Sequence, residues 1–290
     1  MHLYVYDIFP MTTKCLEHFL IENQLVGLKC LHLLLTHKHA DDEQLNCFEI
    51  LKKNGYDQFV YLRLRHMLYS TNKKTFDLLM KNLHLVLVES LKKKPALEHA
   101  LKSKNLKTML DADQKLDEVF GQLVENLYTI QVKPVLIQKH LQAMQMYLFP
   151  LMKCSLLKFT KNLLNALDGL LDHLLQCELY DILETGFLVL HDFLSNINGN
   201  LASEDCTIIL KRLLKSILKL QLEQKLQQHE AIEDLTVQIL VSLENSSNEA
   251  VTKMLTGFSV QVVSSSTIWE PLETSSKLAP FFKQSANSKL

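Results

Sequence analysis

The stretch 162–176 reads N-L-L-N-A-L-D-G-L-L-D-H-L-L-Q and decides the fold class of this chain. Its leucines recur at steps of one and three residues, a spacing that places them on one face of a helix with 3.6 residues per turn. Polar side chains occupy the opposite face, among them Asn165, Asp168 and Asp172. The stretch therefore predicts an amphipathic helix whose leucine face packs against another helix.

The composition extends this prediction to the whole chain. Leucine supplies 60 of the 290 residues, whereas there are only 7 glycines and 6 prolines. Leucine is a good helix former, and a β-sandwich or β-barrel needs many more turn-forming residues. Helical periodicity continues from about residue 11 to about residue 257, with no pattern of paired strands. We therefore predict an all-α protein.

The order of the helices indicates an architecture. A helix and its turn take about 20 residues, so a helical hairpin recurs about every 40 to 45 residues, close to the period of HEAT and armadillo arrays. We predict a HEAT/armadillo-like solenoid of antiparallel helical hairpins over residues 1–257, with a closed helical bundle as the alternative. Residues 258–290, which include Trp269 and Phe281, are predicted to form an irregular tail. The helices expected from the pattern span about 11–21, 24–36, 42–53, 56–69, 73–92, 96–110, 114–131, 163–175, 183–197, 203–220, 230–243 and 248–256.

Pro134 and Pro150 are expected at helix starts or between helices, because proline lacks the N–H that a helix interior requires. The six cysteines include no C-x-x-C pair, and their helical surroundings predict small core residues. The chain begins M-H-L-Y-V-Y-D without the basic region of a secretory signal, and Met254–Trp269 is too short to cross a bilayer. We expect a cytoplasmic protein, with the nucleus as a second location.

The charge of the chain restricts its partners. A net charge of -1 and a pI near 6.9 give no long-range attraction toward nucleic acid or acidic lipid. Lysines are concentrated between Lys92 and Lys107, but no aromatic residue for base stacking lies between Leu91 and Asp111. A solvated connection, broken by Pro95, is the preferred interpretation. No nucleic-acid or membrane partner is predicted.

Three histidines beside two aspartates invite a metal-site interpretation. His32 and His37 are five residues apart, whereas two ligands on one helix face require a spacing of four. We instead expect His37 and His39 at a helix end and in a loop, with Asp41 or Asp42 capping the next helix. No phosphate-binding glycine loop and no nucleophile motif is present, so neither cofactor, metal nor catalytic residue is predicted. A helical enzyme with scattered site residues is the remaining alternative of another class.

Two blocks carry a resemblance to a known family. The first is V-G-L-K-C-L-H-L-L at Val26–Leu34, and the second comprises Tyr56–Tyr61 and Met67–Ser70. Both are similar to the Tel-two-interacting proteins of the second type, subunits of the triple-T co-chaperone complex, in the pattern K-G-L-K-C-L-H-H-L-L and a block ending in Leu-Tyr-Ser. This chain has Leu33 where the family pattern has a second histidine.

The resemblance implies a non-catalytic scaffold that binds the first-type Tel-two-interacting protein and the Tel-two protein. Through them it implies support for the folding, stability and assembly of phosphatidylinositol-3-kinase-related kinases with a heat-shock chaperone. An unrelated HEAT or armadillo adaptor is the alternative. The residues that carry the resemblance, and are candidates for packing or partner binding, are Gly27, Lys29, His32, Tyr61 and Tyr69.

Two of these residues have predicted local roles. Glycine inside a helix costs about 1 kcal/mol relative to alanine, which indicates that a neighbouring helix crosses closely at Gly27. His32 has two interpretations: a buried histidine satisfied by a neighbouring carbonyl, or an exposed residue on a binding ridge. We favour the first.

Overall fold

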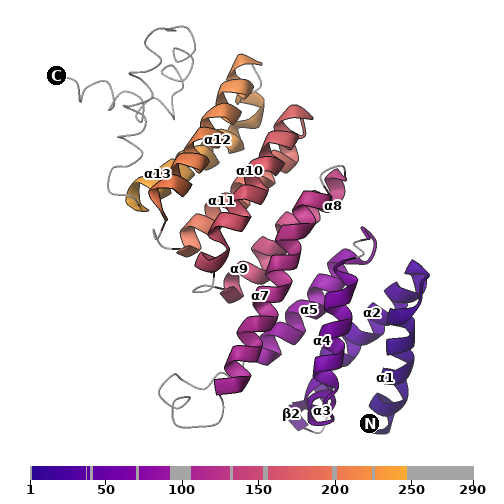
Figure 1. Cartoon of the computed structure of the whole chain (residues 1–290). Helices are drawn as coiled ribbons and strands as arrows, with labels where there is room; N and C mark the ends of the chain where they lie inside the picture. The colour runs from indigo at the N-terminus through magenta and orange to yellow at the C-terminus, as the bar shows by residue number, and fades with distance from the viewer. Residues whose placement is uncertain are drawn as a thin grey trace, which may run out of the picture. The chain divides into compact units, whose positions relative to one another are not determined.

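The computed structural model describes residues 2–36, 38–39, 42–69, 72–91, 106–130, 133–152, 156–197, 201–223 and 226–246 (Figure 1). These residues are helical except for two short strands, which confirms the all-α class. The predicted helix at 248–256, the tail 258–290 with Trp269 and Phe281, and the lysine-rich stretch 92–105 lie outside the described residues. No helix among the described residues combines the length and apolarity needed to cross a membrane.

The described elements follow one another along the chain in this order: α1 His2–Glu17, α2 Ile21–Thr36, β1 Lys38–His39, β2 Asp42–Asn46, α3 Cys47–Lys53, α4 Tyr56–Met67, α5 Phe76–Leu91, α7 Leu106–Thr129, α8 Pro134–Ala143, the π-helix η1 Met144–Leu148, α9 Phe149–Met152, the 3-10 helix η2 Leu156–Phe159, α10 Thr160–Gln176, α11 Tyr180–Ile197, α12 Ser203–Leu222, the 3-10 helix η3 Leu226–His229 and α13 Glu230–Ser246.

The chain divides into two compact units. Unit 1 comprises Met1–Asn126 together with Met146–Leu151, and unit 2 comprises Leu127–Gln145 together with Met152–Leu290. Each unit has its own buried apolar core, in which leucine predominates.

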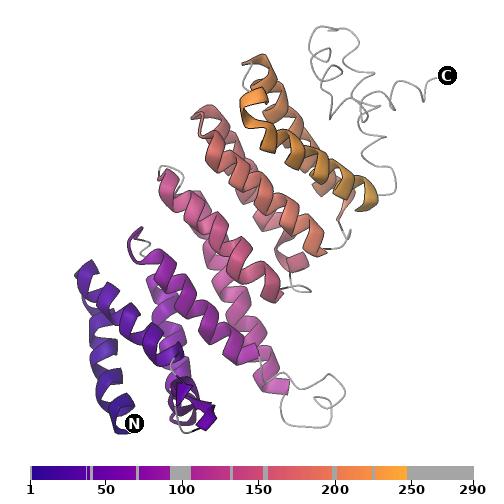
Figure 2. The same cartoon turned by 180° about the vertical axis from the view of Figure 1, so that it is seen from behind.

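In unit 1, neighbouring helices pack against one another. α1 contacts α2, α4 contacts α5, and α2 also contacts α5 (Figures 1 and 2). α7 joins this group through the side-chain amide of Asn126, which donates to the carbonyl oxygen of Leu68 at 3.0 Å. Buried leucines fill the space between these helices because the 3.6-residue period keeps them on one face of each helix.

In unit 2, the contacts again follow an alternating order. α10 contacts both α11 and α12, α11 contacts α8 and α13, and α12 contacts α13. The stretch that predicted the fold class forms most of α10, and its leucines Leu163, Leu167, Leu170 and Leu174 are each at most 1 % exposed. On its polar side, Arg212 of α12 binds both Asp168 and Asp172 of α10.

Residues 134–152, which the predicted helices omit, form α8, η1 and α9, and the largest boundary differences are at α3, α1 and α7. The expected helix at 42–53 begins only at Cys47, because residues 42–46 form β2 and pair with β1 in an antiparallel manner. The sequence D-D-E-Q-L-N before it offers Leu45 as its single apolar residue, so a helix there has no face to bury, whereas Phe48 and Leu51 of α3 are each 1 % exposed. The expectation that no strands pair is therefore wrong for this segment.

The other two differences concern α1 and α7. α1 begins at His2 and contains Pro10, which is exposed and whose carbonyl accepts the Thr13 hydroxyl at 2.8 Å. α7 continues from Leu106 to Thr129, so the predicted break between 110 and 114 is wrong. The residues there include neither proline nor glycine, and the buried face from Leu116 to Leu127 stabilises one long helix.

The prolines and cysteines follow local rules. Pro134 begins α8, as predicted, and Pro150 lies in α9 directly after the π-helix η1. A π turn is wider than an α turn, which suits a proline that cannot donate and whose ring crowds the preceding turn.

Cys206 is buried as predicted, but Cys177 is exposed at the end of α10, so the core assignment is wrong for that cysteine.

Candidate interaction surface

Gly27 lies at the closest approach of α1 and α2. A Cβ atom at this position would lie 2.8 Å from the backbone nitrogen of Leu16 and 3.0 Å from the Cβ of Cys15. Both distances are shorter than side-chain packing allows without movement of the α1 backbone. The glycine therefore permits the crossing, which confirms the close packing predicted from its position within a helix.

His32 belongs to a buried polar link between α2 and α5. Its Nδ1 lies 2.9 Å from Oδ1 of Asn82, and Nδ2 of Asn82 donates to the carbonyl oxygen of Leu28 at 2.8 Å. Asn82 is 0 % exposed, and a buried amide without partners would be costly, so both helices are held at this position. His32 is half-buried and bound to the amide oxygen of Asn82, so it has the expected hydrogen-bond partner but not the expected full burial.

Asn82 was not singled out from the sequence. It lies on the face of α5 that carries Leu79, Leu83 and Val86, all at most 1 % exposed. A polar residue on an apolar helix face indicates a buried hydrogen bond, because a buried amide needs a specific partner. The identity of that partner, 50 residues away in the sequence, is a matter of tertiary packing.

Tyr61 connects α4 with α7. Its side chain is 1 % exposed, and its hydroxyl donates to Oε2 of Glu118 at 2.7 Å and lies 3.1 Å from the carbonyl oxygen of Lys115. Arg65 also binds Glu118, with 2.9 Å between Nη1 and Oε2. Burial, and then the hydrogen bond to Glu118, raise the pKa of the Tyr61 hydroxyl, so it remains a neutral donor. Tyr61 is therefore a structural residue.

Replacing Tyr61 with phenylalanine should lower the free energy of unfolding by about 1 kcal/mol, because a buried hydrogen bond is lost while Glu118 keeps Arg65 as a partner. Chemical denaturation followed by circular dichroism measures the change. Tyr69→Phe is the matched control, since Tyr69 is 59 % exposed and should change stability by less than about 0.5 kcal/mol. Equal effects of the two substitutions would contradict this role for Tyr61.

Lys29 and Tyr69 are the two motif residues at the surface. Lys29 lies on a line of exposed residues along α2, here called the α2 outer stripe: Glu22, Val26, Lys29, Leu33 and Thr36. Tyr69 continues a second line, the α4 aromatic stripe: Tyr56, Phe59, Leu62, His66 and Tyr69. Leu33 is 67 % exposed and Leu62 is 48 % exposed, so no described part of the chain covers these outer sides of α2 and α4.

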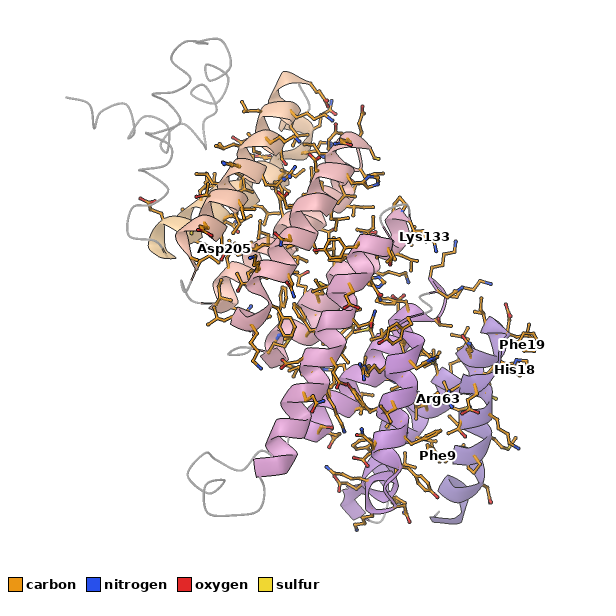
Figure 3. All side chains as sticks on the ribbon, in the orientation of Figure 1. Phe9, His18, Phe19, Arg63, Lys133 and Asp205 are labelled. Atoms are coloured by element: carbon orange, nitrogen blue, oxygen red, sulfur yellow. The ribbon has the colours of Figure 1, made fainter. Side chains whose placement is uncertain are left out.

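The α4 aromatic stripe is bordered by α1. Phe9 of α1 is buried with its ring centroid 5.0 Å from that of Tyr56 and 6.4 Å from that of Phe59. The guanidinium of Arg63 lies 5.6 Å from the Phe59 ring centroid and also binds Glu17 of α1. Figure 3 shows Phe9 and Arg63 between α1 and α4. Contacts with α1 therefore hold Tyr56 and Phe59 along one side of the stripe, although the outer side chains of the stripe are exposed.

The five motif residues do not form one site. Gly27 faces α1, His32 faces α5, and Tyr61 faces α7. Tyr61 and Tyr69 are close enough for the second hydroxyl to contribute to the raised pKa of the first. The motif therefore combines three packing positions with two surface positions, on α2 and after α4.

Other groupings of polar residues serve packing. Nδ1 of His191 lies 3.3 Å from Oδ1 of Asp192, the next residue of α11. The other carboxylate oxygen of Asp192 accepts a hydrogen bond from Nε2 of Gln145 in η1 at 2.5 Å. Asp172 binds Arg212 and Lys215 of α12, and these partners keep the pKa of its carboxyl below its ordinary value.

Among the described residues, no group of three histidine, cysteine or carboxylate side chains could hold a metal ion. A small hollow in unit 2, lined by Leu164, Leu190, Ile208 and Arg212 among others, has room for about one water. We take the exposed stripes of α2 and α4 as the candidate functional surface because they carry exposed apolar side chains. No protein-family model, no curated protein and no solved structure matches this chain.

Proposed function

We propose that this protein is a non-catalytic scaffold subunit of a triple-T-like co-chaperone complex. In this proposal its helical hairpins belong to a HEAT/armadillo-like solenoid, and its surface binds the first-type Tel-two-interacting protein and, with it, the Tel-two protein. The complex would support the folding, stability and assembly of phosphatidylinositol-3-kinase-related kinases in the cytoplasm and nucleus.

The α2 outer stripe is the observation on which the proposal rests. Its helix carries the first family-like block, and Lys29 stands between Val26 and Leu33, which are 50 % and 67 % exposed. Gly27 and His32 of the same block hold the inner side of α2 against α1 and α5. One block thus both anchors the helix and presents a ridge, which is the arrangement by which helical-repeat proteins bind large partners.

The alternating contacts within each unit also support the proposal. In a stack of hairpins each helix contacts its partner in the hairpin and the equivalent helix of the next hairpin. α10 contacts α11 and α12, and α11 contacts α13. In unit 1, α2 contacts α1 and α5.

Co-purification of the full chain from cells tests the proposal. The expected result is recovery of both other triple-T subunits, and Leu33→Glu should reduce that recovery at least about tenfold by placing a charge in a buried contact. Val241→Glu is the control, because Val241 is an exposed apolar residue of α13, 44 % exposed, outside the stripe.

The outcomes separate the alternatives. A clean purification that lacks both triple-T subunits would overturn the assignment. Recovery of a different partner through the same stripe would favour an unrelated HEAT or armadillo adaptor. Equal losses from Leu33→Glu and Val241→Glu would show that the α2 outer stripe is not the binding surface.

A further inference from the structure

The outer face of α1 has a self-complementary pattern. Phe9, Thr12 and Leu16 are buried on the inner side of the helix, at most 6 % exposed. Asp7, Met11 and Lys14 follow one another at steps of four and three residues, which places them together on the opposite side. Met11 is 69 % exposed, and Ile8 at the margin of this face is 40 % exposed. α1 thus exposes the apolar side chain of Met11, with the acidic Asp7 before it along the helix and the basic Lys14 after it.

The two charged residues of this face cannot satisfy each other within one chain. Asp7 and Lys14 are seven residues apart, a rise of about 10.5 Å along a helix. Of the ion pairs found among the described residues, those of unit 1 join Arg63 with Glu17, Arg65 with Glu118 and Lys74 with Glu22. Asp7 and Lys14 are therefore available to an external partner with the opposite order of charges.

A second copy of α1 in the antiparallel direction has that order. If the two Met11 side chains meet at a twofold axis, Asp7 of each copy lies opposite Lys14 of the other, because both positions are nearly equally distant from Met11 along the helix. Such an isologous contact closes on itself and leaves no unpaired surface for further addition. α1 also lies at one edge of unit 1 (Figures 1 and 2).

We infer that the protein self-associates through an antiparallel pair of α1 helices, with Met11 at the centre and two reciprocal Asp7–Lys14 pairs. The contact area of two single helices is smaller than the roughly 800 Å² per partner of a standard interface, so the dimer is weak, with a dissociation constant in about the micromolar range. This association uses α1 and is independent of the partner-binding stripe on α2.

Analytical ultracentrifugation of the full chain at increasing concentration measures the association. The average mass should rise toward that of a dimer, and Met11→Glu should weaken association at least about tenfold, because it places two like charges at the axis. Met146→Glu is the matched control, since Met146 of η1 is 62 % exposed but lies on another element, and its dimer should persist.

Charge reversal tests the pairing itself. Asp7→Lys and Lys14→Asp should each weaken association about three- to tenfold, and the double variant should restore it because the pairs are re-formed with reversed signs. A wild-type chain that stays monomeric up to about 1 mM would overturn the inference, since even weak contacts assemble there. Persistence of the dimer in Met11→Glu, loss in Met146→Glu, or no rescue in the double variant would overturn it as well.

Discussion

Gly27→Ala should lower the free energy of unfolding by about 2 to 4 kcal/mol, although alanine is the better helix former by about 1 kcal/mol. The reason is the crossing of α1 and α2, where the new Cβ would lie 2.8 Å from the backbone nitrogen of Leu16. A backbone atom cannot rotate away, so α1 must move as a whole and lose part of the packing of Phe9 and Leu16. Gly27→Leu should separate the two helices altogether.

Two other glycines provide matched controls for this substitution. A Cβ at Gly186 of α11 would meet Cδ2 of Leu171 at 2.6 Å, the end of a flexible side chain that can rotate, so Gly186→Ala should cost less than about 1 kcal/mol. Gly169 of α10 has nothing within 4 Å of the added atom, so Gly169→Ala should raise stability by about 0.5 to 1 kcal/mol.

Chemical denaturation of the three variants, followed by circular dichroism, gives the ranking. Limited proteolysis adds a local test, because only Gly27→Ala should expose α1 to cleavage. If all three alanine variants are stabilised alike, the propensity gain decides and the α1–α2 crossing is not tight.

Acidification should destabilise the protein through His140. This histidine of α8 is 0 % exposed, and its Nδ1 lies 2.8 Å from the carbonyl oxygen of Leu136. Burial lowers the pKa of its imidazole from 6.5 to about 4 in the folded protein. Between these two pH values the unfolded chain binds a proton that the folded chain does not, so stability falls as the pH falls from 6.5 toward 4. The total loss is about 3 kcal/mol.

His140→Gln isolates this contribution, because glutamine does not titrate. Denaturation at about pH 7 and pH 4.5 should show a loss of stability that is larger by about 2 kcal/mol in the wild type than in the variant. Asp172 does not interfere, since its pKa lies below the ordinary 3.8 and its stabilising effect is lost only at lower pH. Equal pH dependence in the two proteins would show that His140 does not control it.

Residues with a regular pattern were predictable from the sequence. The leucines of 162–176 specify the buried face of α10 because the helical period depends only on local geometry. Gly27 was recognisable as a packing position because a glycine within an apolar helix is costly without a close neighbour. Where the pattern was weak, as in residues 42–46 with their single leucine, the boundary prediction failed.

The exposed residues of the candidate surface could not be distinguished from buried ones by the sequence. Phe59 and Leu62 are exposed, whereas their neighbours Val60 and Leu64 are buried and equally apolar. Residue type alone therefore does not distinguish the exposed side of α4 from the buried side. The packing of α4 against α3, α5 and α7 decides which side of α4 is covered. The same holds for Tyr61 and Tyr69, which share a motif but are 1 % and 59 % exposed.

The sequence by itself determined that this chain is helical, because leucine content, scarce glycine and proline, and the 3.6-residue period act through contacts between near neighbours. Tertiary structure alone decided which partners the polar residues find: Asn82 for His32, Glu118 for Tyr61, and Arg212 for Asp168 and Asp172. These partners are 40 or more residues apart, and their meeting depends on how whole helices pack rather than on any local preference.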